Sequence, residues 1–169
     1  MKQRLFDKLV INLDEMTKHY RILLDSIRKE KDLLIKTDVD RLNENNLLKE
    51  QTLFKIKSLD ILRLNYATEL ALLIGADHHE PRLLEMSQKM GGVEGDRLRS
   101  IHSMLEIITN RLVTLNKENA IYAESALKNV NAAMENIKET FMGPQKTYQK
   151  KGTYQPGYDK SGHLVSREA

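Results

Sequence analysis

One short cluster in the chain carries side chains of the types that bind metals or move protons. It consists of Asp77, His78, His79 and Glu80. Imidazole and carboxylate groups are common ligands of zinc and other divalent metals. Adjacent histidines cannot easily point at one metal ion, however, and no second cluster supplies His or Glu ligands three or four positions apart on a helix. We therefore expect a structural or solvated role for the cluster, and neither a metal site nor a cofactor.

The sequence motifs of the common enzyme classes are absent as well. The sequence has no P-loop, no Gly-rich phosphate cradle after a strand and no nucleophile elbow. Paired carboxylates are frequent, but on amphipathic helices they form the expected solvated face. We therefore predict that the protein is not an enzyme.

The composition is typical of long helices. Hydrophobic residues make up 40% of the 169 residues, whereas aromatic residues make up only 5% and Trp is absent. Without cysteine the chain forms no disulfide, which is compatible with a reducing compartment. No apolar run is long enough to cross a membrane, and the first residues lead into no signal-peptide core. We expect a soluble, cytoplasmic protein without membrane insertion.

The net charge of +3 arises entirely at one end of the chain. From residue 143 onward Lys and Arg exceed Asp and Glu by three, so the preceding residues are balanced. A protein that binds nucleic acid more often carries a basic stripe on its folded face. A nucleic-acid partner is therefore the least favoured of the functions considered.

The longest predicted element is a single helix over about residues 96–142, roughly 70 Å long at 1.5 Å per residue. Its apolar residues recur every three or four positions, which is the heptad pattern of a helix packed against other helices. The seam comprises Leu98, Ile101, Leu105, Ile108, Leu112, Leu115, Tyr122 and Ala126, with Asn119 in the one skipped position. It then drifts through Val130, Met134, Ile137 and Phe141.

A second seam predicts a helix over about residues 2–36. Its members are Phe6, Leu9, Leu13, Met16, Tyr20, Leu23, Ile27 and Leu34, with Glu30 in the skipped position. The segment after it breaks the helix and starts another, with either Asp38, or Thr37 together with Asp40, as the cap. So short a connection makes the two helices antiparallel neighbours.

The helix that follows is predicted over residues 39–74, ending at Gly75. Its start is polar across residues 43–46, so we expect fraying there. Its core side is expected to contain Leu53, Ile56, Leu59, Leu62, Tyr66, Leu70 and Leu73. A short helix over residues 81–90, with Pro81 in its first turn, and a cap at Asp96 complete the order of elements.

These elements predict an all-α fold: an antiparallel bundle or coiled coil of three long helices with a short helical linker between the second and third. We expect residues 1–142 to form this bundle domain and residues 143–169 to be a flexible, basic tail containing Tyr and Gly. Tyr148, Tyr154 and Tyr158 in that tail suit short-motif binding to another protein. An inert solvated extension is the alternative.

The length of the third helix suggests a docking surface. It exceeds the first two helices by about ten residues, so part of its apolar face is expected to lack an internal partner. Met134 adds adaptability to a stripe that includes Val130, Ile137 and Phe141. Self-association is a competing use of this stripe.

Two short motifs accompany this order of elements: Leu115, Asn116, Lys117, Glu118 and Asn119 before an apolar helix, and Tyr158, Asp159, Lys160, Ser161 and Gly162 near the end. Together with the order of elements, these motifs resemble the FlgN-type flagellar export chaperones. The resemblance implies a cytoplasmic chaperone of flagellar type III secretion. Its cargo would be the terminal helices of hook-associated proteins, which it would protect from aggregation and deliver to the export apparatus.

Two sets of binding residues follow as hypotheses. The cargo face is defined as Tyr122, Ala126, Val130, Met134, Ile137 and Phe141. The tail residues Tyr148, Tyr154 and Tyr158 are assigned to docking on the export gate or its ATPase complex. The alternative function is a structural coiled-coil adaptor or homo-oligomer without chaperone activity, which would bury the same stripe permanently in a self-interface.

Overall fold

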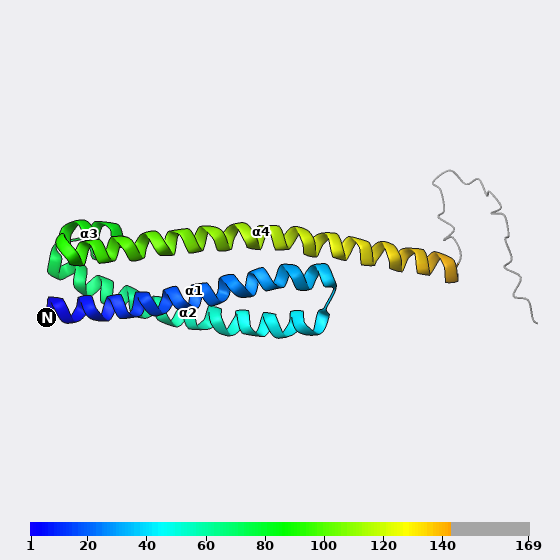
Figure 1. The fold of residues 1–169 in the computed structure, drawn as a ribbon, viewed down its shortest axis with the longest axis horizontal. Helices are drawn as coiled ribbons and strands as arrows, with labels where there is room; N and C mark the ends of the chain where they lie inside the picture. Colours follow the sequence, from blue (N-terminus) through cyan, green and yellow to red (C-terminus); the bar gives the residue numbers. More distant parts are fainter. Residues whose placement is uncertain (143–169) are drawn as a thin grey trace, which may run out of the picture. The chain divides into compact units, whose positions relative to one another are not determined.

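The computed structural model describes residues 1–142, and all of the secondary structure in that range is helical. The helices are α1 (Lys2–Lys36), α2 (Val39–Ile74), α3 (Leu83–Met90) and α4 (Gly92–Met142), drawn in Figure 1. The chain divides into two units, Met1–Asn129 and Val130–Ala169. The predicted all-α class is confirmed, whereas the predictions for residues 143–169 lie outside the described residues.

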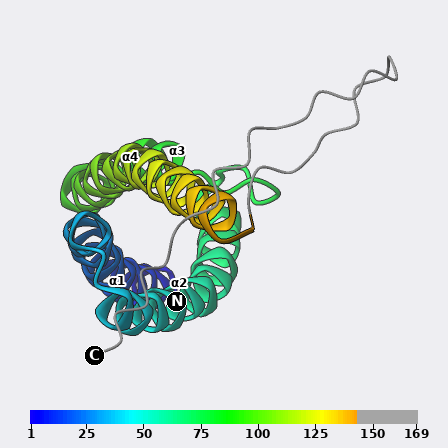
Figure 2. The ribbon, with the colours of Figure 1, turned by 90° about the vertical axis from the view of Figure 1, so that its right-hand side faces the viewer.

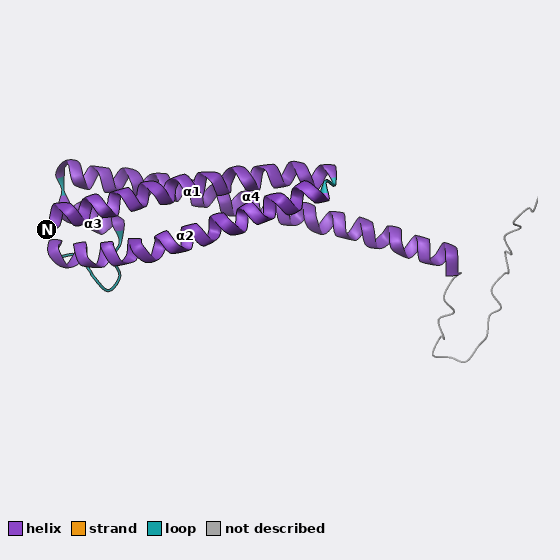
Figure 3. Cartoon of the chain, turned by 90° about the horizontal axis from the view of Figure 1, so that it is seen from below, coloured by secondary structure: helices purple, strands orange, loops and turns teal. Residues whose placement is uncertain are grey.

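Within the first unit, α1 and α2 are antiparallel neighbours, and the α4 residues up to Asn129 lie along α1 in the same direction (Figures 1 and 2). The cartoon in Figure 3 shows the short turn that joins α1 to α2 and the longer loop between α2 and α3. Over residues 1–142, none of the helices combines the length and apolar character that crossing a membrane requires.

The core follows the seams predicted for the first and last helices. One cluster joins Leu9 and Leu13 of α1 to Leu70 of α2 and Leu98 of α4, and all four side chains are fully buried. A second cluster joins α1, α2 and α4 further along. It consists of Leu23, Leu24, Ile27, Ile56, Ile108, Leu112 and Leu115.

The core side predicted for α2 is wrong in part. Ile56, Leu59 and Leu70 are buried as expected, but Leu53, Leu62 and Leu73 are exposed. The small residues Thr52, Ala67 and Ala71 are buried in their place. Small side chains let neighbouring helices approach closely, and a pattern search based on large apolar residues passes over them.

The turn between α1 and α2 is formed by two residues with distinct roles. Thr37 takes the left-handed conformation (φ 55°) and its N–H donates to the carbonyl of Leu34, which ends α1. Asp38 is the N-cap of α2, since its side chain accepts a hydrogen bond from the N–H of Arg41 at 3.2 Å. Of the two caps considered from the sequence, Asp38 is the one observed. The predicted stop at Gly75 is confirmed, with φ 69°.

The joint between α3 and α4 differs from the prediction. α3 begins at Leu83 rather than at Pro81, and α4 begins at Gly92 rather than after a cap at Asp96. Gly91 and Gly92, with φ 65° and 53°, reverse the chain within two residues, so the new helix starts at once. Gly95 then lies inside α4, where a Cβ atom would collide with the carbonyl oxygen of Ser87.

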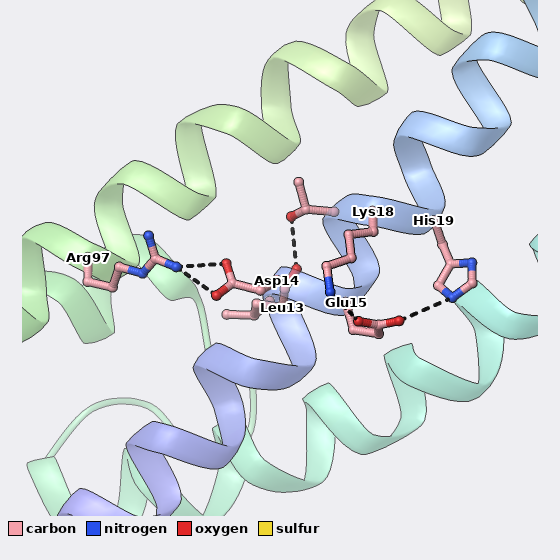
Figure 4. A network of polar contacts seen from close by, with 7 residues as sticks. Leu13, Asp14, Glu15, Lys18, His19 and Arg97 are labelled. Carbon is pink, nitrogen blue, oxygen red and sulfur yellow. Dashed lines mark hydrogen bonds and ion pairs between the residues drawn. The ribbon is translucent and has the colours of Figure 1, made fainter.

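An ion pair ties α1 to α4 near the start of the bundle. The guanidinium of Arg97 donates to both carboxylate oxygens of Asp14, at 2.9 and 2.6 Å (Figure 4). Neighbouring Glu15 forms pairs within α1 only, with Lys18 at 2.9 Å and His19 at 3.7 Å. The hydrogen bond and charge of Lys18 lower the pKa of Glu15. The pair between Asp14 and Arg97 is therefore the contact in this network that fixes one helix against another.

Candidate functional site

The two skipped positions of the heptad seams meet in the structure. Asn119 of α4 is 4% exposed, and its side-chain amide donates to the carbonyl of Ile27 at 2.8 Å and to the carboxylate of Glu30 at 2.9 Å. These two interruptions, each read from the sequence as a gap in an apolar stripe, thus form one polar contact between α1 and α4. A buried polar side chain with specific partners fixes the register of packed helices.

The same contact extends to α2. Lys49 pairs with Glu30 at 2.6 Å, and their side chains are only 18% and 14% exposed. Asn45, 3% exposed, donates its amide to the carbonyl of Ser26 at 3.0 Å. The expected fraying of α2 across residues 43–46 is therefore not observed, because a side chain from that segment is buried and bonded to α1. We call Glu30, Lys49 and Asn119 the polar layer.

An open cavity of about 300 Å³ lies beside the polar layer. Its walls are both apolar and amide-bearing: Glu30, Leu34, Leu42, Asn46, Asn116, Asn119, Ala120 and Ala123. The side-chain oxygen of Asn119 is buried and accepts no hydrogen bond from the described residues. The cavity is thus lined by apolar side chains together with the side chains of Asn46, Asn116 and Asn119.

Along α4 the predicted cargo face is largely exposed. The exposed fractions are 41% for Tyr122, 53% for Val130, 64% for Met134 and 57% for Ile137, and Ala126 is half-buried. The backbone of Phe141 belongs to α4, but its side chain lies outside the described set. Within the second unit, Val130, Met134 and Ile137 follow one another at steps of four and three residues, so they share one face of that part of α4. Large apolar side chains exposed along one face are typical of a surface that binds another helix.

Tyr122 also has a contact within the first unit. The ammonium group of Lys31 lies over its ring, 5.2 Å from the centroid, and the same ammonium pairs with Glu118 at 3.3 Å. A cation above an aromatic face orients the ring. Tyr122 is therefore held in position by α1, and the sequence pattern alone did not indicate this contact.

The cluster at Asp77 has a local structural role. Asp77 accepts hydrogen bonds from the backbone N–H groups of His79 and Glu80, at 2.9 and 3.4 Å. These bonds, the one from His79 first, lower the pKa of the Asp77 carboxyl group. Within residues 1–142 the structure brings together no group of three or more His, Asp or Glu side chains that could hold a metal ion.

The comparison with known protein families assigns residues 1–156 to the family described as FlgN protein. The chain belongs to the FlgN family. Membership implies a role as a flagellar export chaperone, and the family is one of chaperones rather than enzymes. No curated protein and no solved structure matches the chain.

The sequence pattern predicts an apolar face on α4, which stays a prediction as a binding site, but it does not predict the polar contacts near that face. Glu30 and Asn119 were recognised as seam interruptions, yet neither was paired with the other, and Lys49 and Lys31 were not singled out. The sequence does contain a signal for the contact between Glu30 and Asn119. Each of two helices has one polar position in its seam, and two helices that pack in parallel can bring those positions together. Tyr148, Tyr154 and Tyr158, which the sequence analysis assigns to docking, lie outside the described residues.

Proposed function

We propose that this FlgN-family protein is a cytoplasmic chaperone that binds the terminal helices of hook-associated proteins, prevents their premature aggregation and delivers them to the flagellar export apparatus. The family supplies the general role. The observation that carries the finer assignment is the exposed apolar face of α4, on which Val130, Met134 and Ile137 are all more than half exposed.

The chemistry of this face suits a cargo that must later be released. An amphipathic cargo helix would place its apolar side on Val130, Met134 and Ile137, and the apolar surfaces of both partners would thereby be removed from water. Met134 has a flexible, polarizable side chain that adapts to different partners. A narrow stripe with a polar layer before it limits the apolar area buried, which keeps binding reversible.

The test is a double substitution, Met134→Asp with Ile137→Asp, in the full chain. Binding to terminal fragments of the hook-associated proteins of the same bacterium is measured by calorimetry, and helicity by circular dichroism. Ile121→Asp is the matched control, because Ile121 is also exposed, at 68%, and lies about half a turn round α4 from this face. We expect the double variant to weaken binding at least about tenfold, since two charges would face apolar cargo side chains.

Three outcomes separate the possibilities. Loss of cargo binding with retained helicity, and normal binding by Ile121→Asp, supports the cargo face. Unchanged binding by the double variant rejects it. A variant that binds cargo normally but loses concentration-dependent self-association would favour the homo-oligomeric adaptor instead.

The docking step is proposed for Tyr148, Tyr154 and Tyr158. Three tyrosines spaced along a basic segment offer aromatic anchors to a partner surface. Replacing all three by Ala in the full chain should leave cargo affinity unchanged and reduce secretion of the hook-associated proteins. Normal secretion by the triple variant would refute this role.

A further inference from the structure

Helix α3 covers one side of the bundle only near the end where α2 stops and α4 begins (Figures 1 and 2). It packs on α2, and its Met86 is fully buried in the cluster that also contains Ala71 of α2 and Leu98 of α4. α3 thus occupies the place of a fourth helix beside α2 and α4. It has only 8 residues, or about 12 Å of helix, so α3 leaves most of this side uncovered.

Beyond α3 the same side of α2 is exposed. Leu64 and Leu53 precede Ala71 by 7 and 18 residues, about two and five turns of an α-helix. The three side chains therefore lie in one line along α2. Ala71 is fully buried, whereas Leu64 and Leu53 are 47% and 49% exposed. The exposure thus begins where α3 no longer covers the line.

Helix α4 shows the same change along its length. Leu98 is fully buried, whereas Leu105 and Thr109, about two and three turns further on, are half-buried. Val113, about one turn beyond Thr109, is 55% exposed. It lies about 160° round α4 from Arg97, which bonds to α1, so Val113 faces away from α1.

The uncovered parts of α2 and α4 are neighbours. Ile56 of α2 and Ile108 of α4 share one buried cluster, so the two helices pack together at the level of Leu53 and Val113. We call this surface the open strip, and its members are Leu53, Asp60 and Leu64 of α2 with Glu106 and Val113 of α4. Apolar side chains exposed in line along two adjacent helices are typical of a site for another helix.

Two carboxylates give the open strip a negative charge. Asp60 lies in the α2 line between the two leucines, and its side chain is 54% exposed. Glu106 precedes Val113 by about two turns on α4 and is 63% exposed. Glu50 and Lys57, further round α2, offset each other. The net charge of the strip therefore favours a cationic partner.

Each of the two carboxylates has a neighbour that a partner can replace. Asp60 accepts a hydrogen bond from Arg63 of the same helix at 2.7 Å, and Glu106 lies 4.0 Å from His102. The histidine carries a charge only when protonated, and ion pairs this exposed contribute little to stability. Both carboxylates are therefore open to a lysine or arginine from outside the chain.

We propose that the open strip binds a basic amphipathic helix of a partner protein, which continues the line of α3 as the fourth helix of the bundle. α3 shows the pattern that fits this side, because Leu83, Met86 and Met90, at steps of three and four residues, pack into the cluster of α2 and α4. The partner helix repeats this spacing on its apolar side. Lysine or arginine beside that side meets Asp60 and Glu106.

The probe is a synthetic, fluorescein-labelled peptide of about 18 residues, or five turns, with Leu at this spacing and Lys on either side of the apolar stripe. Its twin has Glu in place of every Lys. Anisotropy titrations with the full chain should show that the Lys peptide binds at least about tenfold more tightly than the Glu peptide. Raising the ionic strength should reduce this difference.

The variants locate the site. Leu53→Asp with Leu64→Asp should weaken binding of the Lys peptide at least about tenfold, and Ile121→Asp, on another side of α4, should leave it unchanged. Asp60→Lys with Glu106→Lys keeps the leucines and should reverse the preference, so that the Glu peptide binds more tightly. Helicity is followed by circular dichroism.

A reporter on the strip uses the absence of cysteine in the sequence. Acrylodan on Val113→Cys should shift its emission to the blue when the Lys peptide binds, because the fluorophore leaves water, and acrylodan on Ile121→Cys should not. The site does not depend on the proposed cargo face, since the open strip belongs to the first unit and Val130 begins the second. Met134→Asp with Ile137→Asp should therefore bind the Lys peptide normally.

Three results would overturn the inference. The first is equal affinity for the Lys and Glu peptides. The second is a charge swap at Asp60 and Glu106 that does not reverse the preference. The third is a reporter at Val113→Cys whose emission is already blue-shifted without peptide, which would mean that the chain itself, or a second copy at high concentration, covers the strip.

Discussion

Removing Lys49 tests whether the polar layer stabilises the bundle. The substitution is Lys49→Met, which keeps most of the side-chain length and removes the charge. In the folded protein it leaves the Glu30 carboxylate, 14% exposed, with Asn119 as its remaining hydrogen-bond donor. A largely buried carboxylate without its cation is unfavourable, because the folded protein withholds the solvation that the unfolded chain provides.

The expected magnitude follows from the burial of the pair. Breaking a fully buried ion pair by removing one partner costs about 3–5 kcal/mol, and an exposed pair contributes about 0–1 kcal/mol. The pair between Lys49 and Glu30 is close, at 2.6 Å, but retains some exposure, and Asn119 still donates to the carboxylate. We therefore expect a loss of about 2 kcal/mol in the free energy of unfolding.

The measurement is urea unfolding followed by circular dichroism, with the protein concentration held constant. Lys128→Met is the matched control, since Lys128 pairs with Glu124 at 2.9 Å but both side chains are mostly exposed, at 73% and 67%. That variant should lose no more than about 0.5 kcal/mol. Adding Glu30→Gln to Lys49→Met should recover about half of the loss, because the carboxylate is then replaced by a neutral amide that still accepts a hydrogen bond.

Two results would refute the reasoning. Equal losses for Lys49→Met and Lys128→Met would mean that burial of the layer has no energetic effect. A double variant less stable than Lys49→Met would mean that the Glu30 charge itself, rather than its lost partner, matters for packing.

Two further predictions concern the linker region. Gly95→Ala should destabilise the protein by about 1–3 kcal/mol in the same assay, because the added Cβ atom meets the carbonyl of Ser87 and the backbone must shift. A loss below about 0.3 kcal/mol would contradict this close approach. The Asp77 carboxyl group should titrate below the unfolded value of about 3.9, because the N–H of His79 donates to its charged form. Its stabilising effect is therefore complete above the unfolded pKa and is lost as the pH falls through the folded pKa. An NMR titration of Asp77 with a midpoint at or above the unfolded value would contradict the expected sign.

The sequence predicts the fold well where apolar periodicity is strong. The seams of the first and last helices identify most of the buried side chains, including Leu9, Leu13, Leu98 and Ile101. They err at two seam positions: Leu33 is buried rather than Leu34, which is half-buried, and Tyr122 is exposed. Large apolar residues at a constant spacing leave only one face of a helix that can enter a core. The stop at Gly75 is equally predictable, because glycine takes the left-handed conformation without steric cost. The cap of α2 is predictable only to one of two alternatives, of which Asp38 is the one observed.

Helix α2 is the element for which periodicity fails. Its large apolar residues surround the helix, so a search for the most apolar face mixes the core side with exposed residues such as Leu47 and Phe54. Thr52, Ala67 and Ala71 form much of the true core side, and their burial depends on how closely α1 and α4 approach. That distance is a property of the packed helices together, and no local pattern in α2 encodes it.

The polar layer connects the stable part of this FlgN protein to its proposed activity. In the first unit, the α4 seam before Asn119 is apolar and mostly buried; in the second unit, Val130, Met134 and Ile137 are exposed. If the seam were apolar throughout, α1 and α4 could pack in several registers, and another helix could continue their contact equally well. Asn119 bonds specifically to Ile27 and Glu30, so this position fixes the register of the folded helices. In the proposed function, Val130, Met134 and Ile137 then contribute their burial energy to a cargo helix that can exchange.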